Sequence, residues 1–125
     1  MSRLRFAWIN RIEDVDQEAW DEFARPAETS LLEWAWLRSF ESSGSMSEKT
    51  GWLPCHLLAY RGTTLVGIAP MYVKSHSVGE FVFDYAWAEV AQHIGTEYYP
   101  KLVGMSPATP AVGYRFLVDL SEPDL

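Results

Sequence analysis

The stretch PCHLLAYRGTTLVGIAPMYV, residues 54–73, decides the fold that this sequence predicts. Two runs rich in apolar and aromatic residues, 54–60 and 64–73, flank the triplet RGT at residues 61–63. Gly62 can take the positive φ that a tight turn between two strands requires. The stretch is therefore predicted to form an antiparallel hairpin, and the other elements are placed around it.

Before the hairpin, the sequence predicts one strand and two helices. Over residues 4–12, large apolar residues stand at the alternating positions Leu4, Phe6 and Trp8 and are followed by Ile9 and Ile12, which suits a strand with one buried face. Asp14 begins a capping-box pattern, so a helix is expected from Asp14 to a stop at Pro26. Ser30 begins a second such pattern. The helix over residues 30–40 is apolar almost all round, which predicts that it is covered on most sides.

After the hairpin, short strands alternate with polar loops and one helix that ends at Gly95. The predicted elements are a loop over residues 75–80, a strand over 81–84, a helix over 86–94, and strands over 98–104 and 114–120. This order predicts an α/β (α+β) fold, with a mixed and mainly antiparallel sheet and flanking helices.

Composition narrows the classes of partner. A net charge of -7 argues against a broad nucleic-acid surface, which needs clustered Lys and Arg. The single Cys55 cannot form an internal disulfide. No secretory leader and no apolar run long enough to span a membrane are evident, so a cytoplasmic location is expected. The 125 residues are expected to form a single domain.

Several segments resemble one known family. They are LLEWAWL (31–37), GWLPCH (51–56), APMYVKSHSVGE (69–80), VFDYAWA (82–88) and YYPKL (98–102). The chain is similar through them to the FemAB-like peptidoglycan-biosynthesis proteins, a bacterial group of predicted N-acyltransferases. The resemblance extends from about residue 31 to about residue 115. It implies the N-terminal part of an acyl-CoA N-acyltransferase-like fold, and transfer of an acyl or aminoacyl group to an amine-bearing small molecule or peptide.

The chain is short for such a domain, which needs roughly 150 residues. Residues 121–124 read as the start of a helix, so the domain is expected to be incomplete. A polar, frayed tail is the alternative interpretation. The loop Q/R-x-x-G-x-G/A, which holds the cofactor pyrophosphate in such enzymes, has no match here. The donor therefore remains open between acyl-CoA and aminoacyl-tRNA, and the chain alone is expected to be inactive.

Ionisable residues interrupt the apolar pattern at the ends of predicted strands. His76 and Glu80 are the candidate general bases, because a neutral His or a carboxylate can take a proton from an attacking amine. Lys74 is a candidate for substrate binding and for stabilising a developing oxyanion. Asp84 is a second binding candidate, although it can equally cap the following helix. For His76 and Glu80, the alternative is an ordinary solvated side chain.

The segment YYPK, residues 98–101, is the second candidate binding region. Tyr99 can form the wall of a pocket, and Lys101 can provide a counter-charge for a phosphate or carboxylate. The alternative is a strand with tyrosines on both faces and a solvated lysine. Lys74, His76, Glu80, Tyr99 and Lys101 are expected to converge on one concavity.

Other chemistries lack support in the sequence. His56, His76 and His93 show no paired metal-ligand spacing, so no metal is expected. Cys55 has no base in recognisable register and is interpreted as a structural thiol. Besides a fragment of an N-acyltransferase, two hypotheses remain: a noncatalytic binding domain on the same scaffold, and a half-domain that covers its exposed edge by forming a homodimer.

Overall fold

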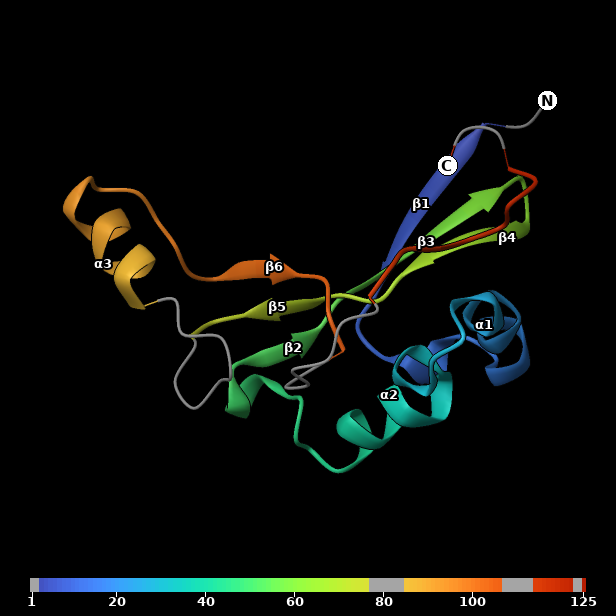
Figure 1. Cartoon of the computed structure of the whole chain (residues 1–125), viewed down its shortest axis with the longest axis horizontal. Helices are drawn as coiled ribbons and strands as arrows, with labels where there is room; N and C mark the ends of the chain where they lie inside the picture. The colour runs from blue at the N-terminus through green and yellow to red at the C-terminus, as the bar shows by residue number, and fades with distance from the viewer. Residues whose placement is uncertain (1–2, 77–84, 107–113, 123–124) are drawn as a thin grey trace.

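The computed structural model describes residues 3–76, 85–106, 114–122 and 125. Two antiparallel sheets with helices beside them confirm the predicted fold class (Figure 1). The four-stranded sheet has the order β1-β3-β4-β7 and the three-stranded sheet the order β2-β5-β6. The strands are β1 (Leu4–Ile9), β2 (Trp52–Pro54), β3 (His56–Arg61), β4 (Thr64–Ala69), β5 (Tyr72–Lys74), β6 (Lys101–Val103) and β7 (Leu117–Val118).

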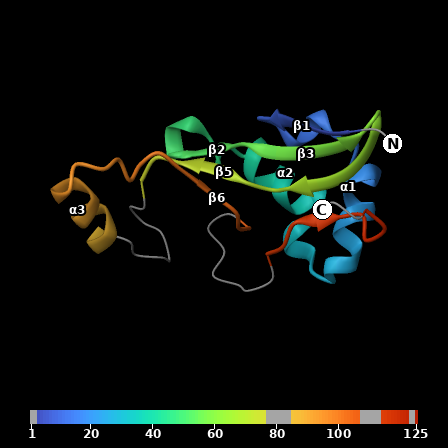
Figure 2. The ribbon, with the colours of Figure 1, turned by 90° about the horizontal axis from the view of Figure 1, so that it is seen from above.

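The α-helices are α1 (Gln17–Ala24), α2 (Trp34–Ser42) and α3 (Tyr85–His93). Short 3-10 turns are η1 (Ile12–Asp14), η2 (Arg25–Ala27), η3 (Ser30–Leu32) and η4 (Glu48–Thr50). Both α1 and α2 lie on one side of the four-stranded sheet, whereas α3 lies at the far end of the molecule, beyond β6 (Figure 1 and Figure 2).

The two sheets are built on one long hairpin. β3 and β4 pair around Gly62, whose φ of 64° confirms the predicted turn. Leu57 lies opposite Ala69 in the four-stranded sheet, and Pro54 lies opposite Tyr72 in the three-stranded sheet. The register between the two arms is therefore the same in both sheets. β2 and β3 therefore form one arm of the hairpin, and β4 and β5 form the other.

Pro70 divides this hairpin into its two sheets. By the register it lies opposite His56, and it has no N–H to donate to the ladder. The N–H of Met71 donates to Nδ1 of His56 at 3.2 Å. The hydroxyl of Tyr114 donates to the carbonyl of Pro70 at 2.6 Å. Side chains thus satisfy backbone groups at the point where the sheet is interrupted.

Glu41 of α2 binds the other nitrogen of His56. Because Nδ1 accepts a hydrogen bond, the neutral ring carries its proton on Nε2 and donates it to Glu41 Oε2, at 3.0 Å. The second oxygen, Glu41 Oε1, accepts from the backbone N–H of Ile12 at 2.9 Å. His56 is fully buried, edge-on to the rings of Trp20 and Tyr72. One carboxylate therefore joins α2, η1 and β3.

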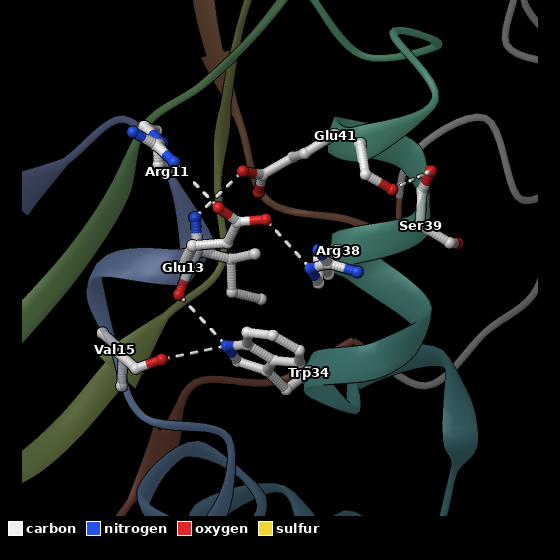
Figure 3. A network of polar contacts seen from close by, with 9 residues as sticks. Arg11, Glu13, Val15, Trp34, Arg38, Ser39 and Glu41 are labelled. Carbon is white, nitrogen blue, oxygen red and sulfur yellow. Dashed lines mark hydrogen bonds and ion pairs between the residues drawn. The ribbon is translucent and has the colours of Figure 1, made fainter.

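The same side of α2 fixes η1 through further polar contacts (Figure 3). Trp34, Arg38 and Glu41 have the i, i+4, i+7 spacing that puts side chains on one side of a helix. Trp34 Nε1 donates to the carbonyl of Ile12 at 3.1 Å, and Arg38 Nε pairs with Glu13 Oε1 at 2.9 Å. The turn after β1 is thus held from one helix.

The helices cover only one face of the four-stranded sheet. The main core between them consists of Ile12, Val15, Trp20, Ala24, Leu32, Leu37, Leu58, Ile68 and Leu117. The opposite face carries Phe6, Trp8 and Phe116, whose exposures are 53%, 54% and 62%. Phe6 and Phe116 line a hollow of about 170 Å³ on this face. Among the described residues, none of the helices covers this apolar face of the sheet.

The first helix begins later than the sequence predicts. Asp16, and not Asp14, is the N-cap of α1, and its side chain accepts a hydrogen bond from the N–H of Ala19 at 3.3 Å. Asp14 ends the turn η1 instead. The helix stops at Ala24, immediately before η2, which contains Pro26. Pro26 ends the α-helix as predicted.

The second helix also differs from its prediction. Ser30 begins η3, and α2 itself begins at Trp34. Leu37 is the one fully buried residue of α2, and Trp36 is 38% exposed. The prediction of cover on most sides is wrong, because α2 packs through a single stripe and its tryptophans also serve as hydrogen-bond donors.

Later elements follow the prediction with shorter strands. α3 is followed by Gly95, whose φ of 76° suits a residue that ends a helix. β6 and β7 cover only parts of the predicted strands 98–104 and 114–120. The strand predicted over residues 81–84 lies outside the described residues.

We expect Glu41→Gln to lower the free energy of unfolding by about 1–3 kcal/mol, the cost of a buried polar group without a partner. A Gln amide that still accepts from Ile12 presents its NH2 to His56 Nε2–H. A change of His56 tautomer would only move the donor clash to the N–H of Met71. Urea unfolding measures the loss.

Glu33→Gln on the same helix is the matched control, since Glu33 is exposed and its side chain makes no capping bond. It should change stability by no more than about 0.5 kcal/mol. Equal unfolding midpoints for the two variants would contradict the role assigned to Glu41.

Candidate functional site

Two lysines lie directly opposite each other in the three-stranded sheet. Lys74 of β5 is the Cα partner of Lys101 in β6 and of Trp52 in β2. Residues paired in this way have Cβ atoms about 5 Å apart on one face of a sheet. Trp52, Lys74 and Lys101 therefore form one row across all three strands, which we call the lysine row.

Aromatic rings lie beside both ammonium groups of the lysine row. Lys74 Nζ lies 5.2 Å from the ring centroid of Trp52. Lys101 Nζ lies 4.1 Å from the ring centroid of Tyr98 and 5.2 Å from that of Tyr99. It also donates to the hydroxyl of Tyr98 at 2.9 Å. These contacts attract the ammonium groups to the rings by cation–π interaction.

Lys74 is the more deeply placed of the two, at 5% exposure. Lysine is seldom so buried unless it is paired. Within the described part of the chain, its ammonium makes no hydrogen bond or ion pair, and its contact is the ring of Trp52. The site thus holds a nearly buried positive charge that no described carboxylate balances.

His76 lies just beyond the end of β5. Ser75 N–H donates to the carbonyl of Gly51 at 2.9 Å, which continues the pairing of β5 with the chain before β2. The ring of His76 lies against Gly51, because a Cβ at that position would be 2.7 Å from His76 Nε2. His76 lies two residues beyond Lys74, the last paired residue of β5, and Tyr99 lies two residues before Lys101, the first residue of β6.

The structure therefore brings Lys74, His76, Tyr99 and Lys101 to one end of the three-stranded sheet. Their roles stay predictions. Glu80 and Asp84, the other two candidates, lie outside the described residues.

The arrangement places chemically different groups side by side. An imidazole can accept a proton from an amine, and two ammonium groups and a tyrosine hydroxyl can bind an anion or an oxygen that becomes negative. Sequence reasoning placed Tyr98 in the candidate segment with Lys101, but it overlooked Trp52 as a neighbour of Lys74. A signal for Trp52 was present in GWLPCH, but only the β2–β5 register shows that it faces Lys74.

Other titratable groups serve the fold instead. Both ring nitrogens of His56 are used in the core. Burial raises the pKa of the Cys55 thiol, which disfavours the thiolate that a nucleophile needs. Burial, and to a smaller extent the Glu41 carboxylate, raises the pKa of Tyr72. Across the described ranges, no three His, Cys, Asp or Glu side chains are grouped to hold a metal ion.

No helix in the described part of the chain is long and apolar enough to cross a membrane.

Comparison with known proteins identifies one family. The model of the FemAB-like family, described as peptidoglycan biosynthesis/recognition, matches residues 11–124. No curated protein and no solved structure matches the chain.

We expect Gly51→Ala to displace His76 and to destabilise the chain more than Gly44→Ala does. Both glycines have a φ near 80°, so both substitutions carry the same left-handed strain of about 1–2 kcal/mol. A Cβ at Gly44 meets nothing within 4 Å, whereas one at Gly51 meets Ser75 Oγ at 2.6 Å. Urea unfolding should show an extra loss of about 1–3 kcal/mol for Gly51→Ala. Equal losses would mean that His76 is not held against Gly51.

Proposed function

The chain belongs to the FemAB-like family of peptidoglycan biosynthesis or recognition, and from that premise we propose that it binds an amine-bearing acceptor for the transfer of an acyl or aminoacyl group to the amine. The observation that supports this proposal is the register of the three-stranded sheet, which sets Lys74 opposite Lys101, with the His76 ring against Gly51 and the Tyr99 ring beside Lys101. The acceptor is a small molecule or peptide related to peptidoglycan.

In this proposal, each residue has a role that its position allows. His76 takes a proton from the attacking amine, with Glu80 as the second candidate base. Lys74 and Lys101 bind anionic groups of the acceptor or the carbonyl oxygen as it becomes negative. Tyr99 forms a wall against the acceptor, and Asp84 is proposed to contact it.

The donor is acyl-CoA or aminoacyl-tRNA. No loop for a cofactor pyrophosphate occurs in the sequence, so the residues of this chain are assigned to the acceptor alone. The same absence favours a second candidate function, noncatalytic recognition of a peptidoglycan-related ligand, which the family description also includes.

The proposal predicts that the chain binds a soluble peptidoglycan peptide with a free side-chain amine more tightly than the same peptide with that amine acetylated. Calorimetry measures both dissociation constants. His76→Ala should weaken binding of the free amine by about tenfold, the value of one hydrogen bond to a charged group.

His93→Ala is the matched control, because His93 is an exposed histidine on α3. It should bind as the unaltered chain does. Equal affinity for the free and acetylated peptides would favour noncatalytic recognition, and absence of binding to either would contradict both candidate functions.

We also propose that two copies of the chain associate through the open face of the four-stranded sheet. In this sheet Phe6 lies opposite Ala59 and Trp8 opposite Leu57, so their side chains share the face that the helices leave uncovered. Exposed apolar patches of a few hundred Å² commonly mark an interaction surface. A second copy would remove this surface from water.

Trp8→Ser should therefore weaken self-association, as measured by light scattering over a dilution series. Trp87→Ser is the control, since Trp87 is more exposed than Trp8 but lies on α3, far from this face. A chain that stays monomeric at all concentrations and binds no hydrophobic dye would contradict the dimer.

A further inference from the structure

We propose that the hollow where the ends of β1, β2 and α2 meet is a binding site for a small amine, whose ammonium group contacts the carboxylate of Glu41. The hollow has a volume of about 270 Å³, and Glu41 and Ser42 of α2, Asn10 after β1 and Pro54 of β2 are among the residues that line it. We call it the Glu41 hollow. The inference goes beyond the proposed function, because no residue assigned to that function lines this hollow.

The first argument is the charge of Glu41. Its side chain is 12% exposed, and its two oxygens accept hydrogen bonds from the N–H of Ile12 and from His56. In the described part of the chain, no Lys or Arg side chain forms an ion pair with it. Carboxylates that are so deeply buried are usually paired with a cation. The wall of the hollow thus carries a negative charge that a ligand can balance.

The residues around Glu41 do not supply the positive charge. His56 Nδ1 accepts the N–H of Met71, and protonation of that nitrogen would break this hydrogen bond. Two guanidinium groups lie nearby, but both Arg11 and Arg38 pair with Glu13 (Figure 3). Their charge is directed to a different carboxylate. A cationic ligand can therefore provide what these three neighbours do not.

The second argument is the number of acceptors in the hollow. A carboxylate oxygen can accept two hydrogen bonds, and each oxygen of Glu41 accepts one within the fold. Asn10 donates through Nδ2 to the carbonyl of Pro54 and keeps its amide oxygen as an acceptor. The hydroxyl of Ser42 can also accept. An ammonium has three N–H donors and no acceptor, so it matches this set of groups, and its hydrogen bond to a carboxylate is charge-assisted.

The third argument comes from the core beside the hollow. Tyr72 shares the small core with Met46, which lines the hollow, and it is the Cα partner of Pro54. Tyr72 is fully buried, and no described residue forms a hydrogen bond with its hydroxyl. Buried polar groups without a partner are rare and often accompany a functional site. The region therefore holds two incompletely satisfied groups, the Tyr72 hydroxyl and the Glu41 carboxylate.

The size of the hollow limits the ligand. Binding pockets for drug-sized molecules have volumes of about 300–1,000 Å³, so the Glu41 hollow suits a smaller molecule or one end of a larger one. Met46 and Pro54 form an apolar part of its wall, and the polar groups form the rest. A short aliphatic amine that also carries a hydroxyl fits both parts.

The test is titration of the isotope-labelled whole chain with ethanolamine, followed by amide chemical shifts at neutral pH and constant ionic strength. Ethylene glycol is the matched neutral probe, because it has a hydroxyl where ethanolamine has the ammonium. We expect saturable shifts at Asn10, Glu41, Ser42 and Met46. Binding of ethylene glycol should be weaker by about tenfold or more, the value of one hydrogen bond to a charged group.

Two variants test the contact from different sides. Glu41→Gln should remove the preference for ethanolamine over ethylene glycol, provided that its other amide shifts show a folded chain. Ser42→Tyr places a ring at the rim of the hollow without altering the contacts of Glu41, and it should weaken ethanolamine binding by about tenfold or more. Ser39→Tyr is the matched control, because Ser39 is exposed on the same helix and does not line the hollow. It should bind as the unaltered chain does.

The outcomes separate this site from the proposed function. Equal affinity for the two probes would overturn the assignment of an amine, and no saturable shift with ethanolamine would overturn the site. Shifts confined to residues 74–76 and 98–101 would mean that the amine binds at the candidate site, which would overturn the present inference and leave the proposed function standing. Binding of ethanolamine in the hollow without binding of the amine-bearing peptide would contradict the proposed function alone.

Discussion

The imidazole of His56 is the contact on which the rest of the structure depends. Pro70 interrupts the hairpin ladder, and Nδ1 of His56 accepts the N–H of Met71 beside that interruption. Accepting on one nitrogen fixes the proton on the other, so His56 must donate to an acceptor, which is Glu41. One buried ring thus links three features. They are the interruption of the sheet at Pro70, the tautomer of His56 and the position of α2. Without this ring, the N–H of Met71 would lack its partner beside the interruption, and a buried group without a partner costs about 1–3 kcal/mol.

This link explains why the candidate site stands apart from the main core. The hairpin keeps its register through the interruption, so the packing of β3 and β4 under the helices determines where β5 places Lys74. The three-stranded sheet has its own small core of Met46, Trp52 and Tyr72. Trp52 belongs both to this core and to the lysine row, and Tyr72 contacts both Trp52 and His56. A change in the main core can therefore reach the site through two aromatic contacts.

Local signals in the sequence predicted the parts of the fold that depend on local chemistry. Gly62 between two apolar runs predicted the turn, and Gly95 predicted the end of α3. The interruption of the ladder at Pro70 could not be predicted as a stable feature, because the N–H beside it is satisfied by the His56 side chain, fourteen residues away from Pro70. The sequence analysis considered His56 only as a metal ligand and found no paired spacing for it. The residues around His56 in the sequence do not indicate that its partner lies on α2. The clustering of Lys74 with Lys101 was expected from their strand-end positions, but their direct opposition is a property of register between strands distant in sequence.

The strands that carry the lysine row are too short to be stable alone, since each has three residues and the row adds like charges. Two features offset this cost. β2 and β5 continue directly from β3 and β4, so their pairing is largely imposed by a hairpin that the main core already stabilises. Cation–π contacts of roughly 0.5–1 kcal/mol each then attract the ammonium groups to Trp52, Tyr98 and Tyr99. Two lysines can therefore lie opposite each other at this end of the sheet, because much of the stability of the pairing comes from the other end.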